Sequence, residues 1–125
     1  MKILIAGSTG TLGYGLCNFL NSINSYKIIR HGFKNADENN IDFTNKNNVI
    51  NFLKDIKPDI IINLICLSNV DDCEKDLNKA LLYNAEIIKY LNIWSLENNC
   101  KIIQISTDQV YDNKDNYNRE EETNI

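Results

Sequence analysis

The sequence predicts an α/β fold with a doubly wound parallel sheet of about five strands, incomplete at its C-terminal end. Three observations predict it. Short apolar runs alternate with segments of helical periodicity, a glycine-rich loop joins the first run to the first helix, and one central run is apolar on both faces. Right-handed crossovers between successive strands then place helices on both faces of the sheet, which is the Rossmann-like arrangement.

The elements of the N-terminal half follow from the spacing of apolar residues. Short runs rich in Ile predict buried strands, and apolar residues at intervals of three and four predict helices. The expected elements are a strand over Lys2–Ala6, a helix over 12–22, a strand over Tyr26–Arg30, a very short strand near Ile41 and a helix over Asn45–Ile56.

Pro58, the only proline, is expected to end that helix and to introduce the central strand Asp59–Ile65. A long helical stretch from Cys73 to about Asn98 follows, whose first part is either helix or a separate turn. Its expected inner face comprises Ala80, Tyr83, Asn84, Ile87, Ile88, Leu91 and Trp94. Lys101–Ser106 is the last expected strand. Residues 1–112 therefore form one dinucleotide-binding type of domain, and residues 113–125 form a polar, acidic tail.

Composition excludes several classes of function. The 125 residues carry a net charge of −4 without a block of Lys or Arg, which argues against a nucleic-acid partner. No apolar run is long enough to span a membrane or to act as a signal peptide, so we expect a cytoplasmic protein. The four cysteines show no metal-ligand spacing and are expected to be reduced thiols. His31 is the only histidine, so a His-based metal site or a Ser-His-Asp triad is not expected.

The loop I-A-G-S-T-G-T-L-G places three glycines between the first strand and the first helix. Gly7 permits a tight turn, Gly10 lets the backbone approach a diphosphate, and Gly13 lets the helix pack close to the sheet. Amides at the start of the helix would point at the phosphates. The residues assigned to cofactor binding here are Gly7, Thr9, Gly10, Thr11, Leu12 and Gly13. The alternative is that small residues only allow close helix packing.

The end of the second strand indicates which dinucleotide is bound. A carboxylate there favours NAD, and a basic residue accommodates the 2′-phosphate of NADP. The strand ends Ile29-Arg30-His31, Lys34 follows, and no acidic residue precedes Asp37. We therefore predict NADP(H) bound with the help of Arg30, with NAD(H) as the alternative cofactor and solvated basic side chains as the alternative reading.

Further motifs run along nearly the whole chain in a fixed order. They are I-D-F-T at 41–44, K-P-D-I-I-I-N at 57–63, N-V-D-D-C-E at 69–74, Y-N-A at 83–85 and I-S-T-D-Q-V-Y-D at 105–112. With the glycine loop, they resemble the N-terminal part of the dTDP-4-dehydrorhamnose reductase family, within the extended short-chain dehydrogenase/reductase superfamily. The acidic motif at 69–74 and the motif at 105–112 are the most diagnostic.

The resemblance implies roles for individual residues. Asp42 and Phe43 would border the adenine, and Cys66, Leu67 and Ser68 would line the cofactor. Asn84 resembles the asparagine that supports the water relay of the catalytic lysine. Thr107 resembles the hydroxyl that binds the substrate carbonyl, and Asp108 a residue near the sugar nucleotide.

Each of these assignments has a structural alternative. Asp42 could start a turn, Asn84 could bond to backbone, and Thr107 could be an ordinary hydroxyl at the end of a strand. The segment Val70–Asp72 could cap the following helix rather than contact substrate.

The sequence departs from the family pattern in two places. Leu64-Ile65-Cys66-Leu67 stands where the family has small residues, which would narrow the site. The superfamily's proton donor is a tyrosine followed four residues later by a lysine, and none of the six tyrosines has a lysine at that spacing. Family spacing would put this pair just beyond Ile125.

We therefore expect the cofactor-binding part of an NADPH-dependent reductase that acts on the 4-keto group of a deoxynucleotide sugar, in the biosynthesis of surface polysaccharide. The 125-residue chain alone is expected to be inactive. The alternatives are a non-catalytic nucleotide-binding regulatory subunit and a sugar-nucleotide epimerase or dehydratase. An open sheet edge also predicts self-association, for instance as a homodimer.

Overall fold

The computed structural model describes residues 1–32 and 39–107. Lys34, Asp37 and Asp108, the domain boundary expected at residue 112, and the expected tail lie outside these residues. Among the described helices, none is long and apolar enough to cross a membrane.

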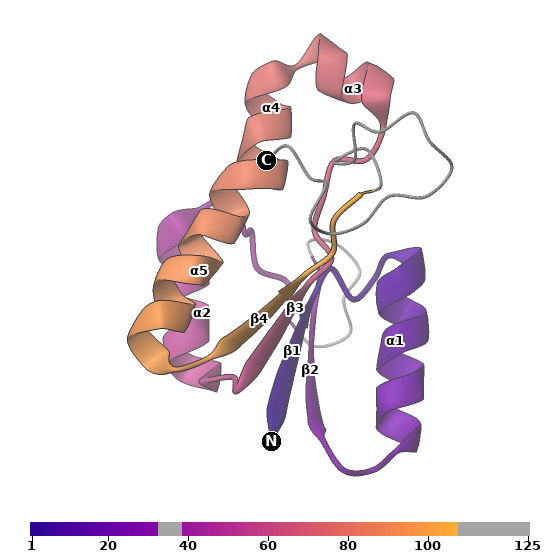
Figure 1. The fold of residues 1–125 in the computed structure, drawn as a ribbon, viewed down its shortest axis with the longest axis vertical. Coiled ribbons are helices and arrows are strands. Elements are labelled where there is room, and N and C mark those ends of the chain that lie inside the picture. Colours follow the sequence, from indigo (N-terminus) through magenta and orange to yellow (C-terminus); the bar gives the residue numbers. More distant parts are fainter. Residues whose placement is uncertain (33–38, 108–125) are drawn as a thin grey trace, which may run out of the picture.

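The described residues form one parallel sheet with the strand order β2-β1-β3-β4 (Figure 1). Its strands are β1 (Lys2–Ala6), β2 (Lys27–His31), β3 (Ile60–Asn63) and β4 (Lys101–Gln104). The very short strand expected near Ile41 is absent, and a single bridge between Gly32 and Asn40 stands in its place. The count of about five strands was therefore one too high for the described residues, because one bridged pair is too short to continue a ladder.

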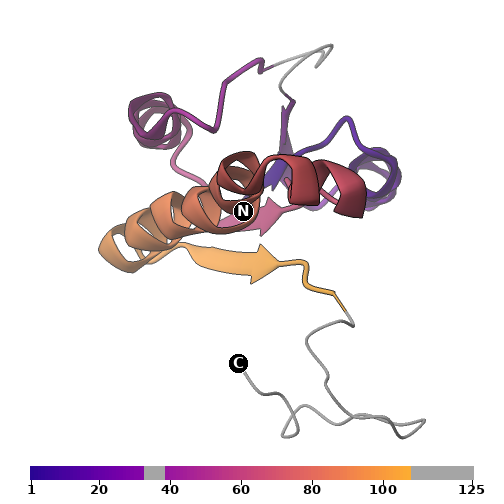
Figure 2. The same cartoon turned by 90° about the horizontal axis from the view of Figure 1, so that it is seen from above.

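Helices cover the two faces of the sheet unequally (Figure 2). On one face, α2 (Lys46–Ile56) and α5 (Ile87–Asn98) pack over a large core that includes Leu4, Ile61 and Trp94. On the other face, α1 (Thr11–Ser22) packs over a smaller cluster. The ammonium of Lys46 also lies 5.9 Å from the ring centroid of Tyr90, which joins α2 to α5.

The helical stretch expected from Cys73 to Asn98 is interrupted once, so that its first part is separate, as the alternative allowed. That part belongs to α3 (Val70–Lys75), and the rest runs without a gap through α4 (Leu77–Leu81), the π-helical turn η1 (Leu82–Glu86) and α5. The break lies at Asp76, whose φ of −140° is not helical and whose carboxylate caps α4 by accepting from Lys79 N at 3.0 Å. An acid that bonds to nearby backbone favours a cap over a helix interior, which explains the break.

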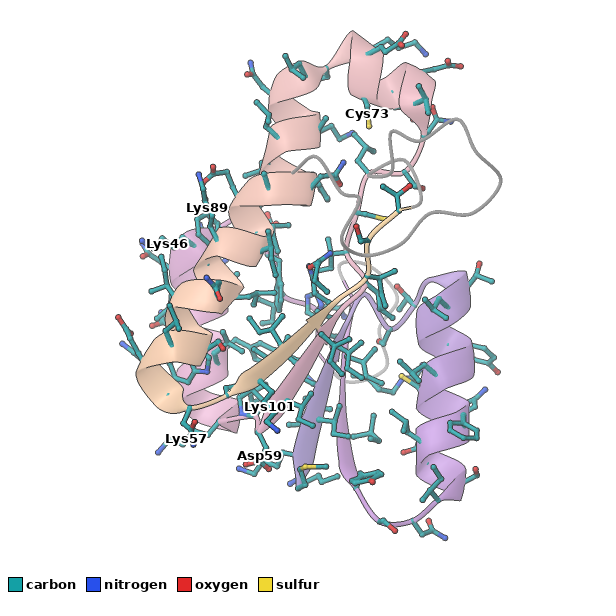
Figure 3. All side chains as sticks on the ribbon, viewed as in Figure 1. Lys46, Lys57, Asp59, Cys73, Lys89 and Lys101 are labelled. Carbon is teal, nitrogen blue, oxygen red and sulfur yellow. The ribbon has the colours of Figure 1, made fainter. Side chains whose placement is uncertain are left out.

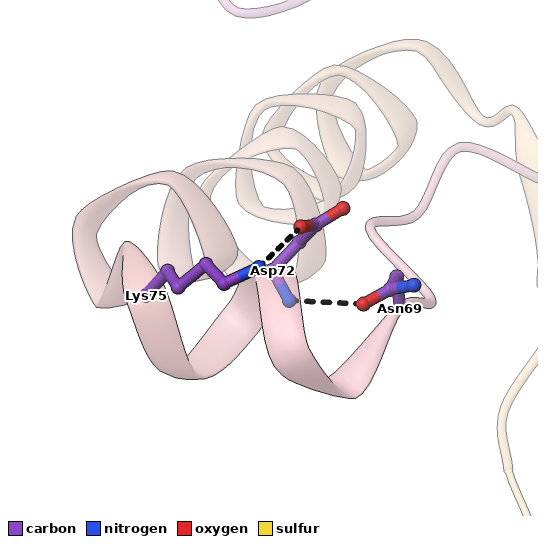
Figure 4. A network of polar contacts seen from close by, with 3 residues as sticks. All are labelled: Asn69, Asp72 and Lys75. Atoms are coloured by element: carbon purple, nitrogen blue, oxygen red, sulfur yellow. Dashed lines mark hydrogen bonds and ion pairs between the residues drawn. The ribbon is translucent and has the colours of Figure 1, made fainter.

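Asn69 caps α3. The alternative that Val70–Asp72 cap the helix is therefore wrong, since these residues form its first turn. The Asn69 side chain accepts from Asp72 N at 2.9 Å, and the Asp72 carboxylate lies 3.7 Å from the Lys75 ammonium (Figure 4). Asp72 therefore points along its own helix toward Lys75.

The two ends of the sheet differ in chemistry (Figure 3). Lys57, Asp59 and Lys101 lie at the amino ends of β3 and β4, whereas Cys73 lies beyond their carboxyl ends. Helix α2 ends at Ile56, before Pro58, because Lys57 adopts a left-handed φ of 45°. The polar groups that could serve chemistry gather at the carboxyl ends, where open α/β sheets bind ligands.

Candidate cofactor site

The glycine loop between β1 and α1 requires glycine at two of its three positions. Gly7 has a φ of +86°, and a Cβ there would lie 3.2 Å from the backbone carbon of Leu64. A Cβ at Gly13 would lie only 2.4 Å from Gly7 O, so the helix could not approach the loop this closely. At Gly10 an added Cβ would meet only Gly7 O, at an ordinary 3.5 Å. The fold therefore dictates Gly7 and Gly13, and leaves Gly10 to be explained by a ligand.

The start of α1 fits a diphosphate group. Gly10 is its N-cap residue and has no side chain to bond to the first amides of the helix. Those amides, with the positive end of the helix dipole, form an anion site in a helix of 12 residues. Because Gly10 also keeps the approach open, the residues present fit the diphosphate of a dinucleotide.

The loop is tied to the end of β2 by three hydrogen bonds to one carbonyl. The O atom of His31 accepts from Gly7 N at 3.1 Å, from Ser8 N at 2.8 Å and from Ser8 Oγ at 3.0 Å. Both Ser8 and His31 are buried. The glycine loop and the end of β2 are thus bonded directly to one another and form one unit.

A cavity of about 210 Å³ opens beside this unit. It is lined by Gly7, Thr9, Gly10, His31, Ile41, Asp42, Phe43, Thr44, Leu64, Ile65, Cys66, Tyr83 and Ile87. The His31 ring stacks on Phe43 with 3.8 Å between centroids, and its Nε2 lies 2.8 Å from Ile41 O. Burial lowers the pKa of the His31 imidazole, and the bond to Ile41 only partly opposes this. The ring is therefore uncharged at neutral pH.

Asp42 both lines this cavity and forms a turn. Its Oδ1 accepts from Thr44 N at 2.9 Å and from Thr44 Oγ1 at 2.6 Å. The turn and the cofactor assignment do not exclude one another, since a carboxylate has further acceptor positions.

A larger cavity, of about 1030 Å³, also borders the loop. Its lining includes Gly7, Gly10, Thr11, Leu12, Gly13, Asn63, Leu64, Ile65, Cys66, Leu67, Ser68, Cys73, Asn84, Gln104, Ser106 and Thr107. Both cavities share Gly7, Gly10 and residues 64–66. A ligand that crosses the glycine loop could therefore extend into both of them.

The sequence predicts Asn84 on the inner face of the helix. In the structure its side chain is exposed instead. Its side-chain amide forms two hydrogen bonds with the backbone of Leu67. Oδ1 accepts from Leu67 N at 2.8 Å, and Nδ2 donates to Leu67 O at 3.0 Å. The thiol of Cys73 also donates to Leu67 O, at 3.3 Å. The π-helical turn η1 carries Asn84, a type of irregularity that often marks functional sites. In this structure Asn84 positions the loop after β3, which lines both cavities.

The carboxyl ends of β3 and β4 are joined by side chains. Buried Asn63 donates from Nδ2 to Gln104 Oε1 at 2.7 Å and accepts from Ile65 N at 3.3 Å. This pair holds the start of the segment that leads to Thr107, which is exposed and lines the larger cavity.

Of the site residues predicted from sequence, Thr9, Asp42 and Phe43 line the smaller cavity, and Gly7, Gly10 and Cys66 line both. Those that line the larger cavity alone are Thr11, Leu12, Gly13, Leu67, Ser68, Asn84 and Thr107. Arg30 is half-buried and lines neither cavity, and Asp108 lies outside the described residues.

Sequence reasoning missed His31 and Cys73 as residues of the site. From sequence, His31 excludes metal and triad chemistry and marks the end of the second strand, where ribose is read, but it receives no role of its own. That position was the available signal. No sequence pattern indicated that the Cys73 thiol bonds to the loop after β3, because its partner Leu67 lies outside the helix that carries Cys73.

Comparisons with known proteins agree with this geometry. The sequence matches the RmlD substrate binding domain family over residues 1–124. It is 31% identical over 111 residues to a dTDP-4-dehydrorhamnose reductase of Aggregatibacter actinomycetemcomitans, which covers 89% of this chain and 36% of that protein. It is 30% identical over 113 residues to the spore coat polysaccharide biosynthesis protein SpsK of Bacillus subtilis, covering 90% and 38%.

Solved structures give the same result. A dTDP-4-dehydrorhamnose reductase ortholog from Clostridium acetobutylicum has a TM-score of 0.81 at 32% identity, over 94% of this chain and 40% of that one. The Bacillus anthracis enzyme in complex with NADP has a TM-score of 0.80 at 30% identity, over 92% and 39%. The chain thus spans 36% to 40% of the length of these relatives. This chain belongs to the RmlD substrate binding domain family.

Proposed function

We propose that this chain forms the dinucleotide-binding part of an NADPH-dependent reductase of a 4-keto deoxynucleotide sugar, in the synthesis of surface polysaccharide. The observation that carries the proposal is the open approach at Gly10, beside the uncapped start of α1. The relatives named as dTDP-4-dehydrorhamnose reductases, and the NADP in the B. anthracis structure, support the choice of substrate and cofactor.

Residues of this chain would hold the cofactor along the two cavities. The glycine loop and the first amides of α1 would bind the diphosphate, and residues 42–43 and 66–68 would flank it on either side. Arg30, next to His31 at the end of β2, would face the 2′-phosphate through its guanidinium. The bound NADPH would supply the hydride that reduces the ketone.

Thr107 would orient the substrate. Its hydroxyl, at the carboxyl side of β4, lines the larger cavity and would donate a hydrogen bond to the C4 carbonyl oxygen. The tyrosine–lysine pair of the superfamily has no counterpart in these 125 residues. We therefore expect this polypeptide to bind dinucleotide without turning over substrate.

Gly10→Ala tests the proposal directly. An added methyl group at Gly10 meets only Gly7 O at 3.5 Å, so folding is expected to be unchanged, while the methyl group obstructs the approach of a diphosphate. We expect NADPH affinity, measured by calorimetric titration, to fall by roughly tenfold or more, which corresponds to about 1.4 kcal/mol.

Gly15→Ala is the matched control, because it adds the same methyl group to α1 where no atom lies within 4 Å. It should leave NADPH binding unchanged. Equal affinities of the wild type and Gly10→Ala would contradict the proposed site, and NADPH-dependent reduction of a 4-keto sugar nucleotide by the 125 residues alone would contradict the expected inactivity.

A further inference from the structure

The amino end of the sheet carries a row of lysines that come from four separate segments. Lys27, Lys2 and Lys101 are the first residues of β2, β1 and β4. Lys57 precedes β3 and lies at the same end as Lys101 (Figure 3). Lys2 and Lys27 are also partners in the register of the parallel strands. Because neighbouring strands lie about 4.8 Å apart, the row crosses about 14 Å of the sheet.

Three of these lysines have no role in holding the fold together. Lys2 Nζ donates to Ile56 O at 3.0 Å and so satisfies a carbonyl at the end of α2. In the part of the chain that the structure describes, the ammonium groups of Lys27, Lys57 and Lys101 form no ion pair and no hydrogen bond. All three side chains are exposed. Their charges are therefore available to a partner.

The amino end of the sheet is positive although the chain as a whole has a net charge of −4. Lys54, in the last turn of α2, adds a fifth lysine to this end. The carboxylates found there among the described residues are those of Asp55, Asp59 and Glu97. The segment 69–81, beyond the carboxyl ends of the strands, instead has four carboxylates and two lysines. An anionic surface would therefore attract the amino end and repel the opposite end.

Exposed apolar side chains lie among the lysines. Met1 precedes Lys2, Tyr26 precedes Lys27, and Lys27 N donates to Met1 O at 3.0 Å. Ile23 lies in the turn between α1 and β2. Met1, Ile23 and Tyr26 are 56%, 43% and 37% exposed.

This mixture of side chains fits the surface of an anionic lipid bilayer. Ammonium groups there approach the anionic headgroups, while apolar and aromatic side chains enter the interface. A nucleic acid would be bound by the lysines but would gain nothing from Met1 and Ile23. The apolar side chains therefore favour a lipid surface.

We propose that the amino end of the sheet, with its lysine row and Met1, Ile23 and Tyr26, docks on an anionic lipid surface. Docking of this kind needs no membrane-spanning segment. It is independent of the proposed function, because the two cavities lie at the carboxyl ends of the strands and stay open to solvent. The sequence does not reveal this surface, since the lysines of the row lie at least 25 residues apart and only the parallel strands bring them together.

Sedimentation with lipid vesicles tests the proposal on the 125-residue protein. Vesicles of phosphatidylcholine and phosphatidylglycerol should bind it at low salt, and vesicles of phosphatidylcholine alone should not. Raising the salt concentration to about 0.5 M should release most of the bound protein, because salt screens the attraction between exposed charges. Absence of binding to the anionic vesicles, or equal binding to both kinds, would overturn the proposal.

Two double variants test which end of the molecule docks. Lys27→Gln with Lys101→Gln removes two charges from the row and should lower vesicle affinity roughly twentyfold, since each lysine near the surface contributes about fivefold. Lys75→Gln with Lys79→Gln is the matched control, because it changes the net charge equally at the opposite end. It should not weaken binding. Equal losses in the two double variants would contradict docking through the amino end.

Ile23→Ser distinguishes a lipid surface from a nucleic acid. It should weaken binding to the anionic vesicles roughly threefold, because an apolar group no longer enters the interface. Tighter binding of the wild type to duplex DNA than to these vesicles would overturn the lipid partner. NADPH affinity should be the same with and without vesicles, and a decrease would contradict a docking surface remote from the cavities. Should a variant fail to fold, the lipid and salt dependence of the wild type still decides.

Discussion

At the level of single residues, His31 makes stability depend on pH. Burial lowers the pKa of its ring in the folded protein below the 6.5 of an exposed imidazole. Above that pH the ring is uncharged in both states. As the pH falls below it, the unfolded chain takes up the proton more readily, so the free energy of unfolding decreases, by at most about 1.4 kcal/mol per pH unit. Urea unfolding between pH 8 and pH 5 measures this.

His31→Phe is the control for that prediction, because acidic residues titrate equally in both proteins. The stability of the wild type relative to the variant should decline below pH 6.5. A difference that is constant with pH would show that the ring does not titrate in this way.

Asn84 positions the loop after β3, because its side-chain amide forms hydrogen bonds with both the N–H and the C=O of Leu67. Asn84→Ala removes two hydrogen bonds and should lower the free energy of unfolding by about 1–2 kcal/mol. It should also weaken NADPH binding, since the released loop lines both cavities. Thermal melting and calorimetric titration measure the two effects.

Asn98→Ala is a matched control at the end of α5, where the amide donates to Trp94 O at 3.0 Å, away from either cavity lining. It should lower stability without changing NADPH affinity. If both variants affected binding equally, the Leu67 contact would have no special role.

The candidate site could be predicted from sequence wherever a motif dictates the backbone. The glycine positions follow from the short distances a turn requires, and Thr107 follows from a strand end. The partner of Asn84 could not be predicted, because it lies 17 residues away and depends on a π-helical turn. The buried Nδ1 atom of His31 has no hydrogen-bond partner among the described residues. This could not be predicted either, because the orientation of the ring is set by contacts with Ile41 and Phe43 that no local pattern reveals.

At the level of elements, a helix boundary can be predicted from sequence where a cap or a glycine marks it. The prediction fails where a single acidic residue interrupts a segment with helical periodicity. Helix α1 was expected to begin near residue 12, and it begins at Thr11. The stretch from Cys73 to Asn98 keeps its helical periodicity across the break at Asp76. A single capping carboxylate overrides that pattern locally.

The junction between the glycine loop and α1 tests how closely two elements must pack. Gly13→Ala would place a methyl group 2.4 Å from Gly7 O and 2.7 Å from Ser8 Cα, both backbone atoms that cannot rotate away. The free energy of unfolding should fall by about 1–3 kcal/mol, as overpacked sites do. Gly15→Ala in the same helix should instead raise it, by up to about 1 kcal/mol. Chemical denaturation that shows equal effects would disprove the close packing.

At the level of the whole molecule, the parallel sheet could be predicted from alternating strands and helices, but the unequal cover of its faces could not. Ile103 of β4 pairs in register with Ile62, yet it is 47% exposed while Ile62 is 9% exposed. Helix α1 packs beside β1 and β2 and does not extend over β4 (Figure 2). Within the part of the chain that the structure describes, β4 is therefore an edge strand that carries an exposed apolar side chain.

An edge of this kind should make the chain self-associate at high concentration, because unpaired strand edges and exposed apolar patches promote pairing. Ile103→Lys places a charge on this edge and should weaken self-association by roughly tenfold or more without destabilising the fold, since the side chain is half-exposed. Leu96→Lys is the matched control, because Leu96 is 78% exposed and belongs to helix α5 instead of the edge strand. Sedimentation of the three proteins across a range of concentrations measures the effect. A monomeric wild type at high concentration, or equal effects of the two substitutions, would show that the β4 edge does not mediate association.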